Sequence, residues 1–190
     1  MIDMVRWEPG AKDRLRVAAL DLYAERGFEQ TTATDIARAA GVTERTFFRH
    51  FADKREVLFD GQDQLKNVFV EAVAQAPDDA SAMDVVAQAV SSAGTFFDDD
   101  HRPYSRARQT VIDANPGLQE RELLKMATLS RAVASGLITR GVSEPQATLA
   151  AEVGVSVFGV AFRQWIAADE ERSFEDIADG LFRDLRALTN

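Results

Sequence analysis

Residues 32–50 hold two short stretches that favour helix, and a glycine separates them. Thr32 is placed to cap the first stretch, Gly41 favours a sharp turn, and Thr43 is placed to cap the second. Ala37 is small enough to let two helix backbones approach closely. Two helices of about eight residues joined by a short turn containing Gly form the helix-turn-helix motif, whose second helix enters the major groove of DNA. The pattern predicts a DNA-binding module.

The second stretch separates apolar from polar side chains. Phe47 and Phe51 are four residues apart and are expected to face the core. Arginine can donate two hydrogen bonds to guanine, threonine can contact a thymine methyl or a phosphate, and glutamate can accept from cytosine. The polar residues that offer this chemistry are Glu44, Arg45, Thr46, Arg49 and His50. The alternative interpretation is an ordinary solvated helix face of mixed charge.

A wider set of residues between about Leu15 and Leu58 has a regular spacing: Gly27-Phe28, Thr31-Thr32, Ile36-Ala37, Ala40-Gly41-Val42, Thr43, Phe48, His50-Phe51, Lys54 and Leu58. This spacing closely resembles the amino-terminal domain of the tetracycline-repressor (TetR) family of bacterial regulators. The family usually has Tyr where this chain has Phe48, so one hydroxyl that could reach a phosphate is missing.

The resemblance implies a role for each matching position. Positions matching Thr32, Thr34, Phe48, His50 and Lys54 mostly contact phosphates, and those matching Glu44, Arg45, Thr46 and Arg49 face base edges. The candidate DNA-binding residues are therefore Thr32, Thr34, Thr43, Glu44, Arg45, Thr46, Phe48, Arg49, His50 and Lys54.

Helix-favouring residues dominate the whole chain, and no segment shows sustained alternation typical of strands. Capping residues and Gly or Pro stops predict nine helices, over 11–26, 33–40, 44–50, 54–75, 82–98, 101–114, 117–140, 144–168 and 174–188. We expect an all-α fold: a three-helix helix-turn-helix domain over 1–53 and a helical ligand-sensing and dimerisation bundle over 54–190. The fourth helix would begin beside Lys54, where backbone N–H groups favour an anion.

The charge distribution is compatible with DNA binding although the net charge is −9. Residues 31–55 carry five basic and three acidic side chains, whereas residues 61–190 carry 12 basic and 20 acidic ones. The acidic charge is thus concentrated away from the predicted DNA-binding helix, and a locally basic face remains possible.

Two carboxy-terminal helices are candidates for a homodimer interface. Residues 147–168 carry only Glu152 and Arg163 as charges, so this helix must be covered on nearly all sides. The last helix repeats apolar residues in a narrow seam typical of helix against helix. The candidate dimerisation residues are Gly154, Gly159, Phe174, Ile177, Leu181 and Leu185. The alternative is a monomer in which both helices only close the core.

Large apolar side chains on the middle helices are candidates for an effector cavity, with two polar residues as anchors. The candidate ligand-binding residues are Phe96, Phe97, Tyr104, Arg121, Met126, Phe158, Phe162 and Trp165. Each aromatic residue taken singly is more often core packing than cavity wall, and the sequence does not identify the ligand.

Several classes of protein are disfavoured. The chain has no cysteine, so disulfides and thiolate metal sites are excluded, and we expect no cofactor. Asp98, Asp99, Asp100 and His101 have metal-binding chemistry, but consecutive residues at a helix end diverge, so a capped helix start is the preferred interpretation. With only two histidines and no nucleophile suitably spaced from His101, an enzyme is not expected. We also expect no membrane span and no signal peptide, hence a cytoplasmic protein.

The sequence thus predicts a dimeric regulator that binds a palindromic operator in double-stranded DNA and is released by a small-molecule effector. Two alternatives stay open: a ligand-independent DNA-binding dimer, and a helical enzyme or carrier with a vestigial DNA module.

Overall fold

A computed structural model describes residues 10–189, and every regular element in this range is helical, which confirms the all-α fold class. The described α-helices are α1 (Ala11–Arg26), α2 (Ala33–Ala39), α3 (Glu44–His50), α4 (Gln62–Gln75), α5 (Ala82–Ser92), α6 (Arg102–Asp113), α7 (Pro116–Thr139), α8 (Glu144–Trp165) and α9 (Phe174–Thr189). Two short 3₁₀ helices, η1 (Ala93–Phe96) and η2 (Asp99–His101), lie between α5 and α6. The helix predicted over 82–98 therefore ends early and continues as a tighter turn.

The chain divides into two compact units. The first comprises residues 1–60 and 107–118, and the second comprises residues 61–106 and 119–190. Helix α6 begins in the second unit and ends in the first. The sequence predicts a single domain boundary, after residue 53. Local sequence patterns do not reveal that residues 107–118 return to the first unit.

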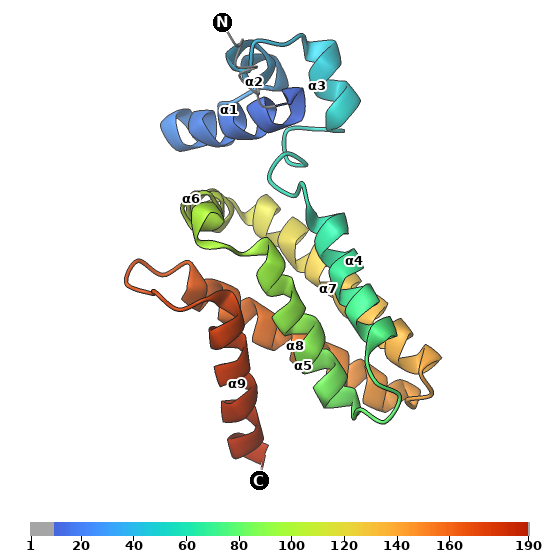
Figure 1. Cartoon of the computed structure of the whole chain (residues 1–190). Coiled ribbons are helices and arrows are strands. Elements are labelled where there is room, and N and C mark those ends of the chain that lie inside the picture. The colour runs from blue at the N-terminus through green and yellow to red at the C-terminus, as the bar shows by residue number, and fades with distance from the viewer. Residues whose placement is uncertain (1–9, 190) are drawn as a thin grey trace, which may run out of the picture. The chain divides into compact units, whose positions relative to one another are not determined.

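The first unit places α1, α2 and α3 around a small core (Figure 1). Leu15 of α1, Ile36 of α2 and Phe47 of α3 are fully buried. Ala37 is also buried, as expected for the residue that lets two of these helices approach closely. The three-helix module predicted from the spacing is present.

The second unit packs α4, α5, α7, α8 and α9 around one apolar core. In Figure 1, α4 and α7 run side by side, and a Cβ added at Gly136 of α7 would lie 2.9 Å from Cγ1 of Val73 on α4. At Gly154 of α8 the corresponding distance to Cγ1 of Val86 on α5 is 2.2 Å. Glycines therefore set the spacing of two helix pairs within this unit.

Most predicted helix starts are confirmed by their caps. The Ser81 hydroxyl accepts from the backbone N–H of Asp84 at 3.2 Å, and that of Ser173 accepts from Asp176 at 3.0 Å. Asp98 likewise accepts from the N–H of His101 at 2.9 Å, so it caps η2 as expected.

The predicted start of the fourth helix is wrong. Asp53 accepts from the N–H of Glu56 at 3.1 Å, but residues 54–61 form turns and α4 begins only at Gln62. Val57, Leu58 and Phe59 are all buried. Three consecutive buried side chains would point to different sides of an α-helix, so their burial favours an irregular backbone.

Helix α8 is long and apolar enough, by length and composition, to cross a membrane, which the sequence argument did not anticipate. In the fold one side of α8 lies in the core of the second unit, where Ala151, Phe158 and Trp165 are buried. Burial against the other helices accounts for the apolar residues on this side of α8, whereas Leu149 and Val160 are exposed.

Candidate nucleic-acid interface

The start of α2 is organised by a reciprocal capping box. The Thr32 hydroxyl accepts from the N–H of Asp35 at 3.1 Å, and the Asp35 carboxylate accepts from the N–H of Thr32 at the same distance. The Thr32 hydroxyl also donates to this carboxylate at 2.6 Å. Hydrogen bonds from the hydroxyl and backbone N–H of Thr32 hold the pKa of Asp35 below its ordinary value. Thr32 therefore fixes the exposed amino terminus of α2.

The turn between α2 and α3 depends on a left-handed glycine. Gly41 has φ of 67°, and the N–H of the next residue, Val42, donates to the carbonyl of Ala37 at 2.9 Å. Thr43 then caps α3 by accepting from the N–H of Thr46 at 3.1 Å. The Thr34 hydroxyl donates to the Glu44 carboxylate at 2.8 Å, which ties the starts of α2 and α3 together.

The outer face of α3 carries the predicted base-reading arginines. Arg45 and Arg49 are exposed, and neither has a hydrogen bond or ion pair with another described residue. Phe47 is buried on the opposite side, with its ring centroid 5.7 Å from that of Phe51, as predicted. Phe48 is 50% exposed and stands edge-on to Phe47 at 5.3 Å. Two cationic side chains and an apolar ring therefore project from one short helix.

His50 lies at the end of this helix and is half-buried. Its Nε2 atom is buried and has no hydrogen-bond partner among the described residues. This ring nitrogen can act as a donor or an acceptor, depending on the tautomer of the imidazole.

Lys54 does not lie at the start of α4, as the sequence predicts, but in the turns that precede this helix. Its ammonium donates to the carbonyl oxygens of Phe28 at 2.8 Å, Thr31 at 3.0 Å and Glu29 at 3.3 Å. It also lies 4.4 Å from the centroid of the Phe28 ring. An ammonium has three donors, and here all three are used. The hydrogen bonds of Lys54 therefore hold the segment after α3 against the loop between α1 and α2.

Residues 107–118 complete the first unit, which the sequence did not suggest. Ile112 of α6 and Leu118 of α7 are buried, and Arg108 Nε donates to the carbonyl of Leu58 at 2.5 Å. The Arg108 guanidinium also lies 5.3 Å from the ring centroid of Phe59. The irregular segment 54–61 is thus held by the end of α6, and no local sequence signal would have revealed this pairing.

Family profiles match both parts of the chain. Residues 15–60 match the profile described as bacterial regulatory proteins, tetR family, and residues 80–190 match the MftR C-terminal domain. The second match covers more than half of the chain. The protein belongs to the TetR family.

Two curated regulators show how the similarity is distributed. The HTH-type transcriptional regulator TcmR of Streptomyces glaucescens is 41% identical over 66 residues, which are 35% of this chain. This match spans only 29% of TcmR itself. The transcriptional regulator MftR of Mycobacterium tuberculosis is 26% identical over 167 residues, covering 86% of this chain and 83% of MftR.

Solved structures show the same fold at low identity. A structure assigned to the TetR family from Syntrophomonas wolfei has a TM-score of 0.66 at 15% identity, covering 94% of each chain. FadR of Thermus thermophilus, a TetR-family repressor solved in complex with lauroyl-CoA, has a TM-score of 0.53 at 21% identity, covering 92% of this chain and 93% of FadR.

Four of the eight predicted effector residues of this TetR-family protein form a packed cluster. The Phe97 ring centroid lies 5.8 Å from Phe158, 5.5 Å from Phe162 and 5.4 Å from Trp165. Phe174, which was predicted for the dimer interface, joins them at 4.8 Å from Phe97. These rings contact one another and fill the space between their helices, so they are core residues in this structure.

The remaining predicted effector residues are scattered. Phe96 is partly buried against the core, and Tyr104 is half-buried near the start of α6. Arg121 and Met126 line a separate pocket between α4 and α7. The structure thus does not gather the eight residues into one cavity.

The structure places most of the predicted dimer residues against the core of a single chain. Phe174, Ile177 and Gly154 are buried within the single chain, and Leu181 and Leu185 pack partly against the same core. The apolar stripe of α9 packs against α5 and α8. The sequence could not distinguish this arrangement from a dimer contact, because an apolar stripe on a helix has the same spacing whether it packs within a chain or between chains. Gly159 differs, since a Cβ there would meet nothing within 4 Å.

Proposed function

We propose that this TetR-family protein is a homodimeric, sequence-specific DNA-binding repressor that releases its operator when a small molecule binds. The observation that carries the proposal is the outer face of α3, where Arg45 and Arg49 are exposed and have no hydrogen bond or ion pair within residues 10–189. Arginines on a helix in the major groove donate two hydrogen bonds each to guanine. The excess of basic residues over 31–55 supports the same assignment.

We assign base contacts to Glu44, Arg45, Thr46 and Arg49, and backbone contacts to Thr32, Thr34, Phe48, His50 and Lys54. The three donors of Lys54 bond to carbonyl oxygens, so Lys54 would attract a phosphate through its charge. The capping box at Thr32 and the Thr34–Glu44 hydrogen bond support this arrangement, because they orient the starts of both helices. Thr43 contributes by ordering the first turn of α3. Phe48 has no hydroxyl, so its exposed ring would contact the DNA backbone through apolar atoms only.

A two-fold homodimer would present two α3 helices to a palindromic operator in double-stranded DNA. Successive major-groove half-sites on one side of the duplex lie about 34 to 36 Å apart, so both helices must be held at a defined separation. The protein would act in the cytoplasm, where its operator is located.

A small-molecule effector would bind the second unit and lower the affinity for DNA. The FadR structure shows a protein of this fold holding a small molecule, which supports an effector here. Helix α6 is the proposed element of communication, because its two ends belong to different units. A coupling free energy of about 1 to 3 kcal/mol between the two sites would suffice.

The test is a gel mobility shift with duplex fragments flanking the protein's own gene, with and without a metabolite extract. The wild type should retard one fragment, the Arg45→Ala/Arg49→Ala double variant should not, and the extract should release the fragment. Retention of the fragment in extract would favour the ligand-independent dimer. If a wild-type protein with full helical circular dichroism retards no fragment, the DNA-binding proposal is refuted and a carrier or enzyme gains support.

A further inference from the structure

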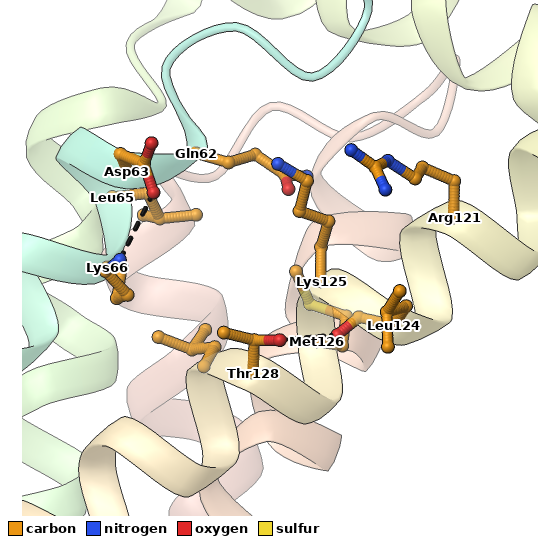
Figure 2. A pocket seen from close by; sticks show the side chains of 10 residues that line it. Gln62, Asp63, Leu65, Lys66, Arg121, Leu124, Lys125, Met126 and Thr128 are labelled. Carbon is orange, nitrogen blue, oxygen red and sulfur yellow. Dashed lines mark hydrogen bonds and ion pairs between the residues drawn. The ribbon is translucent and has the colours of Figure 1, made fainter. Parts of the chain in front are cut away.

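A pocket of about 230 Å³ lies between α4 and the first half of α7, entirely within the second unit (Figure 2). The residues that line it are Gln62, Asp63, Leu65, Lys66, Arg121, Leu124, Lys125, Met126, Thr128 and Leu129. Drug-sized ligands occupy pockets of about 300 to 1,000 Å³. The smaller volume here suits a polar head with a single short alkyl chain.

The pocket is basic within an acidic protein. Three of its side chains are cationic and one is anionic, whereas the whole chain has a net charge of −9. Lys66 pairs with that single carboxylate, Asp63, at 3.2 Å. The charge of Asp63 is thus partly balanced by its neighbour on α4. With Arg121 and Lys125 on α7, the side chains that line the pocket include more cations than anions. This charge favours an anion.

The polar side of the pocket also offers hydrogen bonds. Figure 2 shows Gln62 and Lys125 reaching toward each other from the two helices, with Arg121 extending toward the same opening. The Oε1 atom of Gln62 is buried and has no hydrogen-bond partner among the described residues. Oε1 is an acceptor, so a bound anion cannot pair with it, but the Nε2 end of the same side-chain amide can donate a hydrogen bond to an anion.

The opposite side of the pocket is apolar. Leu65 of α4 and Leu129 of α7 are buried there, and Met126 packs against the same core. Methionine is flexible and adapts to ligands of different shape. A ligand that fills the pocket therefore needs both a charged end and an apolar end.

We propose that this pocket binds an amphiphilic anion, with a carboxylate or phosphate held by Arg121, Lys125 and Gln62 and a short apolar chain against Leu65, Met126 and Leu129. The assignment rests on the proposed effector response, because it names the chemical class of the effector. In the aromatic cluster around Phe97 the rings instead pack against one another, with the centroids of Phe158 and Trp165 at 5.8 Å and 5.4 Å from that of Phe97.

The test uses isothermal titration calorimetry of the full chain with octanoate, octyl phosphate and octanol. Octanoate or octyl phosphate should bind, and the ligand that binds more tightly identifies the preferred head group. Octanol, which has no charge, should bind at least about tenfold more weakly. Arg121→Gln and Lys125→Gln should each weaken anion binding by at least about tenfold, since hydrogen bonds to charged groups have this strength. Arg131→Gln removes the same charge from an exposed residue of α7 outside the pocket, so it should bind like the wild type.

Three results would overturn the assignment: no binding of either anion, octanol binding as tightly as the anions, or equal affinity in the wild type and both pocket variants. Circular dichroism of each variant must first show unchanged helix content. The same preparations are assayed for DNA binding in the gel shift. Intact DNA binding without anion binding refutes this pocket and leaves the proposed regulator standing, whereas loss of DNA binding in the wild type refutes the regulator itself.

Discussion

Among single residues, Lys54 combines a role implied by its family with a different role visible in the fold. Its three hydrogen bonds to carbonyl oxygens hold the α1–α2 connection. We expect Lys54→Met to lower the free energy of unfolding by about 1 to 3 kcal/mol, because three carbonyl oxygens, two of them in part-buried hydrogen bonds, lose a charged donor. Urea denaturation measures the change. The control is Arg38→Met, whose side chain is 76% exposed and should alter stability by no more than about 0.5 kcal/mol.

A Lys54→Met protein of unchanged stability that binds every DNA sequence more weakly would contradict this structural role. It would instead assign Lys54 to a phosphate alone, with a reduced dependence of affinity on salt.

Arg49 should affect only DNA recognition, because it is exposed and no other residue in the described part of the chain pairs with it. Arg49→Ala is expected to leave stability unchanged and to relax base preference at one position per half-site by about 1 to 3 kcal/mol. Selection of bound sequences from a randomised DNA pool, followed by affinity measurement, gives this value. Arg26→Ala, at the end of α1, should keep the wild-type preference, and an equal loss for all sequences with Arg49→Ala would show a phosphate contact instead.

At the level of helices, α8 contains two glycines with opposite surroundings. A Cβ at Gly154 would approach Cγ1 of Val86 to 2.2 Å, and valine cannot easily move this methyl because its χ1 is restricted. Gly154→Ala should therefore destabilise the second unit by about 1 to 3 kcal/mol through overpacking. Gly159→Ala meets nothing within 4 Å and should be neutral or stabilise by up to about 1 kcal/mol through helix propensity.

Thermal and urea unfolding of both variants test the prediction for α8. Equal stability of the two would mean that α5 and α8 can separate without cost, contrary to the close packing at Gly154. Size-exclusion chromatography of Gly159→Ala adds a check, because a change of oligomeric state would place this open position at a subunit contact.

For the whole molecule, the outward face of α8 now replaces the inner seam of α9 as the candidate dimer surface. Leu149 and Val160 are exposed there, and Gly159 is open. Val160 is 51% exposed, so Val160→Glu should leave the monomer folded but weaken dimerisation, since a carboxylate would lie in an apolar contact without a partner. Light scattering gives the mass, and the gel shift should show parallel loss of operator binding.

Leu123→Glu serves as the matched control for the dimer, because this residue of α7 is 70% exposed and lies outside the proposed surface. It should remain dimeric. Val160→Glu that also remains dimeric and binds its operator normally would place the subunit contact on another face of the second unit.

Local sequence determined the helices, their caps and the turn at Gly41, because each depends on residues only a few positions apart. It also identified the face of α3, since helical spacing alone separates Phe47 from Arg45 and Arg49. Only the tertiary structure decided which apolar stripes turn inward, and it placed Phe174 and Ile177 in the core of one chain. The tertiary structure likewise decided the hydrogen-bond partners of Lys54, because the carbonyl oxygens that accept from its ammonium lie 23 or more residues earlier in the chain. Such long-range contacts override helix propensity in residues 54–61, where burial of Val57, Leu58 and Phe59 outweighs the gain from regular hydrogen bonding.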